Sequence, residues 1–245
     1  MNQPQHSELE KLKEIIDNSK KIVFFGGAGV STESGIPDFR SVDGIYNQKY
    51  DYPPEVILSH TFFVQHTSEF FKFYRERMVY TNAKPNATHY ALAKLEEKNL
   101  IAVITQNIDG LHSAAGSKNV LELHGSVLRN YCSLCHKFHK VEEIMKSLDI
   151  PRCECGGIIK PDVVLYEEQL DNTVVSLSIS ALSIADTLII GGTSLNVYPA
   201  ASLIGAFNGK NLIVINKSTT QADRNANLVI NGNISDFLSI KNLNL

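Results

Sequence analysis

The feature that most constrains the fold of this chain is a series of short apolar runs that alternate with helix-like stretches. The apolar runs occur at residues 21–25, 100–105, 120–123, 187–190 and 212–215. The helix-like stretches lie at residues 7–18, 88–98, 174–185 and 199–207, and the capping-box pair Ser7 and Glu10 should start the first of them. Strands that are apolar throughout are buried on both faces, and strands alternating with helices form a parallel sheet between helices. We therefore expect an α/β fold with a Rossmann-like, doubly wound parallel sheet.

Two segments interrupt this alternation. Residues 41–82 are rich in aromatic side chains, and residues 131–157 hold every cysteine of the chain. We expect these inserts to form a smaller domain, part helical and part zinc-binding. The large domain would then consist of residues 1–40, 83–130 and 158–245. A chain of 245 residues is long enough for both.

Charge and hydropathy argue against several kinds of partner. The formal net charge is −3 and no block of Lys and Arg occurs, so nothing marks a nucleic-acid surface. The first residues lack the apolar stretch of a secretory signal, and no apolar run is long enough to cross a bilayer. We expect a cytoplasmic protein without nucleic-acid or membrane partners. In that reducing compartment, clustered thiols are more often metal ligands than disulfides.

The cysteines form two close pairs, Cys132-x-x-Cys135 and Cys153-x-Cys155, separated by 17 residues. Four thiolates in such pairs are typical of a closed tetrahedral zinc site, although unliganded or redox-active thiols are alternatives. His136 and His139 lie nearby, but four thiols already complete the ligand shell. Because a four-ligand site leaves no open position, we expect the zinc to be structural.

A glycine-rich segment, GGAGVSTESGIPDFR, runs from Gly26 to Arg40 after the first strand. Gly27 and Gly29 would let the backbone turn tightly and bring the amides of a helix start to a diphosphate. Thr32 stands where a third glycine is usual, and G-x-G alone could be an ordinary turn. A simple turn would not require the carboxylate, aromatic ring and guanidinium of residues 38–40, which favours a binding role for this segment. Arg can bind phosphate, and Phe can shield a reactive sugar carbon from water.

Polar residues also follow two of the other predicted strands. QNIDGLH occupies residues 106–112, and ELHG occupies residues 122–125. Side chains just past the carboxyl end of a strand face the ligand crevice of a doubly wound sheet, although a plain loop would also explain them. His124 has a side chain whose ordinary pKa lies near neutrality, which suits a base that accepts a proton from a sugar hydroxyl.

Taken together, these motifs resemble those of the sirtuin family. The match includes GAGVS, GIPDFR, QNIDGLH, ELHG, the cysteine pairs and GTSLNVYP at residues 192–199, and so extends along nearly the whole chain. The resemblance implies a protein lysine deacetylase that converts acetyl-lysine protein and NAD to lysine, nicotinamide and O-acetyl-ADP-ribose. It implies NAD contacts at Gly27, Ala28, Gly29, Ser31, Asp38, Phe39, Arg40, Gln106, Asn107, Ile108, Asp109, Gly192, Thr193, Ser194, Asn216 and Ile234.

The resemblance also implies roles in catalysis and in substrate binding. His124 would be the general base, and Asn107 would order the acetyl group and a water. Acetylated proteins or peptides would be the partners of a monomeric enzyme that carries one structural zinc. Their contacts would be Val164, Tyr166 and Glu167 on one side and Val197 on the other.

Two positions bear on substrate preference. Glu167 stands where sirtuins usually have glycine, which leaves the peptide preference open. Relatives that remove acidic acyl groups carry Tyr and Arg three residues apart, and we align those places with Phe71 and Tyr74. Tyr74 and Arg77 have the required spacing, but three residues later. We therefore expect a neutral acyl group, acetyl first.

Three other functions compete with deacetylation. A protein mono-ADP-ribosyltransferase could use the same NAD site, although His124 favours deacetylation. A dehydrogenase is disfavoured by the missing third glycine and by the GIPDFR segment. A zinc-ribbon interaction module would leave the glycine-rich motifs unexplained.

Overall fold

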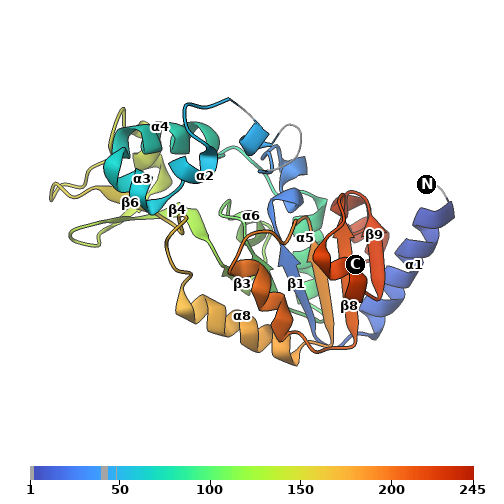
Figure 1. Ribbon diagram of the computed structural model, residues 1–245. Coiled ribbons are helices and arrows are strands. Elements are labelled where there is room, and N and C mark those ends of the chain that lie inside the picture. Colours follow the sequence, from blue (N-terminus) through green and yellow to red (C-terminus); the bar gives the residue numbers. More distant parts are fainter. Residues whose placement is uncertain (1–2, 40–43, 48) are drawn as a thin grey trace.

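The computed structural model describes residues 3–39, 44–47 and 49–245, and a parallel sheet of six strands lies at its centre (Figure 1). The sheet consists of β1 (Ile22–Gly26), β2 (Leu100–Thr105), β3 (Val120–Glu122), β7 (Thr187–Gly191), β8 (Asn211–Asn216) and β9 (Leu228–Asn231). Their order is β3-β2-β1-β7-β8-β9, so the chain winds outward in both directions from β1 and β7. This order confirms the doubly wound, Rossmann-like sheet. Such sheets bind ligands at the point where the winding reverses.

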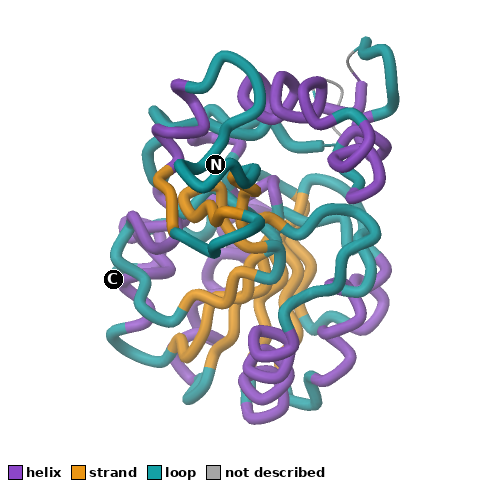
Figure 2. The backbone as a smooth tube through the Cα atoms, turned by 90° about the vertical axis from the view of Figure 1, so that its left-hand side faces the viewer, coloured by secondary structure: helices purple, strands orange, loops and turns teal. Residues whose placement is uncertain are grey.

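Helices cover both faces of this sheet, as Figure 2 shows. Successive residues of a strand point to opposite faces, so Ile22 and Phe24 join one core while Val23 and Phe25 join another. The first core is closed by α1 (Gln3–Asn18), α5 (Ala87–Glu96) and α9 (Ile240–Leu243). The second is closed by α8 (Asn172–Ile184) and by a 3-10 helix over Ala200–Ala206. No helix within the described ranges combines the length and apolarity that a membrane span requires.

Most predicted elements lie within a few residues of the observed ones, with three differences. Helix α1 begins at Gln3, so the predicted capping-box start at Ser7 is wrong. Pro4 is tolerated there because the amides of a first helical turn have no partner within the helix. The stretch at 199–207 forms a 3-10 helix instead of an α-helix, and the short strand β9 was not predicted.

A smaller lobe lies to the upper left of the large sheet in Figure 1. Its antiparallel sheet has the order β5-β4-β6 and consists of β4 (Gly125–Cys132), β5 (Phe138–Lys140) and β6 (Ile159–Val163). Helices α2 (Pro54–Ile57), α3 (His60–Gln65), α4 (Thr67–Arg77) and α7 (Val141–Lys146) complete the lobe. Phe70 and Phe71 of α4 share one core with Val127 and Ile144, so the two inserts pack together. The small sheet begins before residue 131 and extends past residue 157, and the division into domains stays a prediction.

Candidate functional site

Two glycine-bearing loops touch each other where the winding of the large sheet reverses. The amide of Gly29 donates a hydrogen bond to the carbonyl oxygen of Gly192 over 2.8 Å. A Cβ atom on Gly29 would lie 2.8 Å from the Cα atom of Gly192, and one on Gly27 would lie 2.8 Å from the Cβ atom of Thr193. Side chains at these positions would therefore force the loops apart.

The backbone after β1 differs from the one that we predicted. Gly27 has a φ of −137°, a value that other residues also adopt, so the backbone conformation does not require glycine here. Glycine is required because the two loops lie too close together for a side chain. No α-helix starts after this glycine. The helix start predicted here belongs to the first of two short 3-10 helices, over Ala28–Val30 and Thr32–Ser34.

A first cavity opens over these loops and the carboxyl ends of the neighbouring strands. The predicted residues that line it are Gly27, Ala28, Gly29, Asp38, Phe39, Gln106, Asn107, His124, Gly192, Thr193, Ser194, Val197, Asn216 and Ile234. Sequence reasoning missed Glu33, Lys217, Ser218 and Gly232, which also line this cavity. Gly232 directly follows β9, so a prediction of that strand would have marked it as a candidate site residue.

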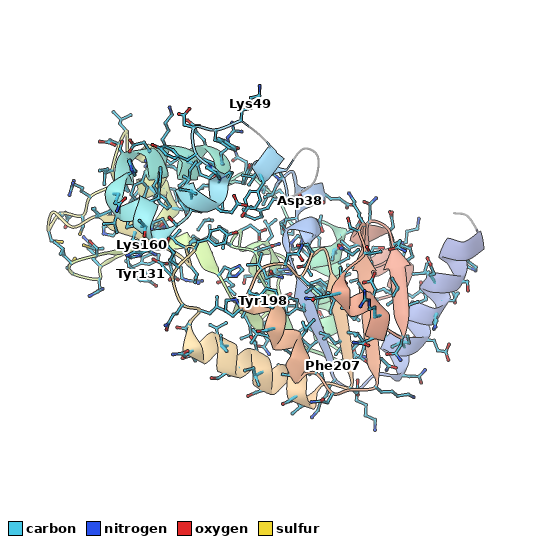
Figure 3. The ribbon with its side chains drawn as sticks, viewed as in Figure 1. Asp38, Lys49, Tyr131, Lys160, Tyr198 and Phe207 are labelled. Atoms are coloured by element: carbon cyan, nitrogen blue, oxygen red, sulfur yellow. The ribbon has the colours of Figure 1, made fainter. Side chains whose placement is uncertain are left out.

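A second cavity lies between the large sheet and the small lobe. The predicted residues that line it are Ala28, Ser31, Phe39, Gln106, Asn107, Ile108, Asp109, His124, Val164, Tyr166, Glu167 and Val197. Since Phe39, Asn107, His124 and Val197 line both cavities, the cavities adjoin beside His124. In Figure 3, Asp38 and Tyr198 lie between the two lobes. Every described residue of the predicted NAD and peptide sets lines one cavity or both, and Arg40 lies outside the described residues.

His124 has the hydrogen bonding and burial of a neutral base. Its Nδ1 atom lies 2.9 Å from the carbonyl oxygen of Gln106. Because a carbonyl only accepts, Nδ1 carries the proton and the lone pair lies on Nε2. Burial lowers the pKa of His124 by penalising the charged ring, while the hydrogen bond to Gln106 acts in the opposite direction. The ring is therefore ready to accept a proton at neutral pH.

Side-chain hydrogen bonds fix the loop that follows β2. Asn107 Nδ2 donates to Ser31 Oγ over 3.1 Å, and Ser31 Oγ donates to Asp109 Oδ2 over 2.6 Å. On the other side, Gln106 Nε2 donates to Thr193 Oγ1 over 3.0 Å. The loops after β1, β2 and β7 are thereby joined into one unit, which holds their polar groups in place.

The segment after β6 connects the base to the small lobe. The amide of Val164 donates to the carbonyl oxygen of His124 over 3.0 Å. Glu167 has a φ of 75°, in the left-handed region that favours glycine. Its Oε2 atom accepts hydrogen bonds from the amide and the hydroxyl of Thr61, over 2.9 and 2.7 Å. These bonds to the first turn of α3 offset the cost of the left-handed backbone.

The residues aligned with the acidic-acyl motif do not face the second cavity. Phe71 and Tyr74 are buried in the core of the small lobe. Arg77, on the same helix, is the one that lines the cavity. The expectation that no cation lies near the acyl group was based on Phe71 and Tyr74, which do not line this cavity. The preference for a neutral acyl group stays a prediction.

The four cysteines meet at one end of the small lobe. Their sulfur atoms all lie within 4.8 Å of one another, with 3.3 Å between Cys132 and Cys155 and 3.7 Å between Cys135 and Cys153. These distances exclude disulfides, whose S–S bonds measure about 2.05 Å, and approach the spacing of about 3.8 Å between sulfurs around tetrahedral zinc. The amides of Leu134 and Cys135 point to the Cys132 sulfur, as suits a thiolate. The residues present fit a closed zinc site, and none of the four cysteines lines either cavity.

Comparisons with known proteins agree with this architecture. The NAD-dependent protein deacetylase of Clostridium perfringens (strain 13 / Type A) is 62% identical over 236 residues, which cover 94% of this chain and 97% of the relative. A solved structure of Sir2 with a deacetylated p53 peptide and 3′-O-acetyl-ADP-ribose superposes with a TM-score of 0.87 at 40% identity, covering 94% of this chain and 95% of that one. Sir2 with a p53 peptide and NAD+ has a TM-score of 0.83, the same identity and the same coverage. The model of the Sir2 family matches residues 27–199, and with these identities along nearly the full length, the chain belongs to the Sir2 family.

Proposed function

We propose that this protein is an NAD-dependent protein lysine deacetylase, which converts acetyl-lysine protein and NAD to lysine, nicotinamide and O-acetyl-ADP-ribose. The observation that carries the proposal is the place of His124, a neutral base where two cavities adjoin. One cavity has the glycine-bearing loops of a dinucleotide site, and the other is bordered by an extended chain segment. The names of the relatives, which are NAD-dependent protein deacetylases, agree with it.

In this proposal the first cavity holds NAD. Residues 27–29 and 192–194 would face the diphosphate, because both loops line this cavity and can offer it backbone amides. Asn216 and Ile234 would contact the adenosine, Gln106 the nicotinamide ribose, and Ile108 with Asp109 the carboxamide. Ser31, Asp38 and Phe39 would complete the site, together with Arg40. Bound NAD supplies an electrophilic ribose carbon and a leaving group, nicotinamide.

The chain's own residues would orient the acyl group, exclude water and move one proton. Nε2 of His124 would accept a proton from a ribose hydroxyl, since Nδ1 is engaged with Gln106. Asn107 would order the acyl group and a water. Val164 and Val197 would flank the lysine stem, which is neutral when acetylated and enters an apolar channel at little cost. The backbone of Glu167 would pair with the extended peptide, and the side chain of Tyr166 would border it, because the amide and the carbonyl oxygen of Tyr166 are already bonded to Leu58 and His60.

The four cysteines would bind one zinc ion as thiolates, at Cys132, Cys135, Cys153 and Cys155. A tetrahedral site with four protein ligands has no place for substrate, so the zinc would hold the small lobe together. The cytoplasmic location, the monomeric state and the absence of nucleic-acid and membrane partners stay predictions.

The test is to incubate the protein with an acetylated peptide, with and without NAD, and to follow peptide mass and free nicotinamide. We expect loss of the acetyl group, with one nicotinamide and one O-acetyl-ADP-ribose per lysine, only when NAD is present. A succinylated peptide in parallel tests whether Arg77 permits an acidic acyl group. ADP-ribose on the peptide or the protein, without deacetylation, would support the ADP-ribosyltransferase instead. No change in the acetylated peptide would contradict the proposal.

A further inference from the structure

His124 lies on a very short link between the two sheets. Strand β3 of the large sheet ends at Glu122 and strand β4 of the small sheet begins at Gly125, so two residues join them. The link runs directly against β6. Gly125 has a φ of 75°, and a Cβ atom there would lie 1.9 Å from the carbonyl oxygen of Asp162. The place of the His124 ring therefore depends on how the two sheets are held relative to each other.

Arg129 bridges the two sheets at this point. Its Nη1 atom donates to Glu122 Oε2 of β3 over 2.6 Å, and its Nε atom donates to Asp162 Oδ2 of β6 over 2.7 Å. The Glu122 side chain is only 14% exposed, so this contact is shielded from water. Burial raises the pKa of Glu122, and the bond to Arg129 opposes that shift by favouring the carboxylate. A planar guanidinium can satisfy both carboxylates at once, which an ammonium group does less well.

The same strand also supports the loop after β2. The pairing of β4 with β6 passes from Ser126 opposite Asp162 to Asn130 opposite Pro161, so residues 127–129 bulge out of the ladder. Within this bulge, the amide of Val127 donates to the carbonyl oxygen of Ile108 over 2.9 Å. Arg129 closes the bulge, and its two ion pairs thereby fix a backbone that contacts the Ile108 loop as well as the link.

We propose that Arg129 is a positioning residue for His124. By joining Glu122 on the large sheet to Asp162 on the small one, it sets the base and the Ile108 loop in their working places. None of these three charged residues lines either cavity, so Arg129 acts through the backbone and does not touch the reactants. This inference rests on the proposed deacetylase function, because its readout is turnover.

The experiment compares the unaltered chain with Arg129→Ala, Arg129→Lys and Glu122→Gln. A matched control, Lys137→Ala, removes an exposed ion pair of the small lobe, that between Lys137 and Glu154 at 3.0 Å. We expect kcat for deacetylation to fall about 10- to 100-fold in Arg129→Ala, the size of effect that a misplaced catalytic group produces. The KM for NAD should change less than about 3-fold, since the glycine-bearing loops are intact. Arg129→Lys should lose less activity than Arg129→Ala, and Lys137→Ala should match the unaltered chain.

Added guanidinium separates positioning from folding. Millimolar guanidinium can occupy the space between the two carboxylates and should restore part of the kcat of Arg129→Ala, which loss of folded protein would not allow. If Arg129→Ala does not fold, Glu122→Gln keeps the size of the side chain and should still lower kcat. A kcat within 2-fold of the unaltered chain for both folded variants would overturn the inference. An unaltered chain without deacetylase activity would instead overturn the proposed function.

Discussion

The Nδ1 atom of His124 lies 2.9 Å from the carbonyl oxygen of Gln106, whose own side chain donates to Thr193 over 3.0 Å. Gln106 thus joins the proposed base to the second glycine-bearing loop. The hydrogen bond fixes the ring's orientation and leaves its other nitrogen, Nε2, as the basic atom. The proposed base and the proposed dinucleotide site are therefore parts of one hydrogen-bonded unit. Substitutions of His124 and of Gly29 test the two parts separately.

Replacing the base should remove activity without unfolding the protein. His124→Ala loses one hydrogen bond to a carbonyl, which costs about 1 kcal/mol of folding free energy. Deacetylation should fall by about 10²- to 10⁴-fold, the usual contribution of a general base. Peptide mass spectrometry gives the rate, and a thermal melt confirms folding. A folded His124→Ala protein with full activity would exclude the base assignment.

The contact between the two glycine-bearing loops predicts that one alanine substitution is harmful and that another has little effect. Gly29→Ala places a methyl group 2.8 Å from the Cα atom of Gly192 and should weaken NAD binding and destabilise the fold by about 1–3 kcal/mol. Gly205→Ala is the matched control, because a methyl group there meets no atom within 4 Å. Calorimetric titration with NAD and denaturant unfolding measure both effects. Equal NAD affinity in the two variants would argue against a dinucleotide bound over these loops.

Zinc removal should loosen the small lobe. The Cys132→Ala and Cys135→Ala double variant should lose its single zinc ion, read by metal analysis, and should melt at least about 5 °C lower. Ser133→Ala, in the same loop, is the control and should keep both zinc and melting point. If the double variant melted like the unaltered chain, the cysteine cluster would have no structural role.

Two buried histidines should make the fold sensitive to acid. Burial lowers the pKa of His89 to about 4 and that of His112 to about 3, below their ordinary value of 6.5. The unfolded chain binds protons below pH 6.5 while the folded chain does not. Their stabilising effect is therefore complete above pH 6.5 and is lost as pH falls from 6.5 toward 4, by roughly 1.4 kcal/mol per pH unit for each ring.

Urea unfolding at pH 7, 6 and 5 measures this slope. His112→Leu should make the slope shallower, because it removes one of the two rings. Neither ring nitrogen of His112 has a hydrogen-bond partner among the described residues, so the substitution sacrifices no such bond. An unfolding free energy that stayed constant between pH 7 and pH 5 would contradict the prediction.

The sequence predicted best those elements whose residue pattern has a single physical cause. Runs such as residues 100–105 are apolar throughout because both faces of the strand are covered, so β2 was predicted to the residue. Residues directly after such strands, among them Asn107 and Thr193, necessarily reach the same edge of the sheet. The strands therefore predicted where the candidate site lies, while the individual residues and their roles came from the resemblance to the sirtuin family.

Features that depend on contacts between residues far apart in the chain could not be predicted from the sequence. Arg129 drew no attention in the sequence, since its role depends on Glu122 and Asp162 on two other strands. The contact of Gly29 with Gly192 was not foreseen, because it joins segments far apart in the chain. The register of α4, which turns Arg77 to the second cavity and Tyr74 into the core, is likewise set by packing.

The most direct test of the account is a crystal structure of the protein with NAD and an acetylated peptide, in the His124→Ala variant if turnover is too fast. We expect the diphosphate to lie over residues 27–29 and 192–194 in the first cavity. A hydroxyl of the nicotinamide ribose should lie within hydrogen-bond reach of the position of His124 Nε2, and the acetyl-lysine should lie between Val164 and Val197. A cofactor bound elsewhere, or one whose nicotinamide ribose faces away from position 124, would contradict the central claim.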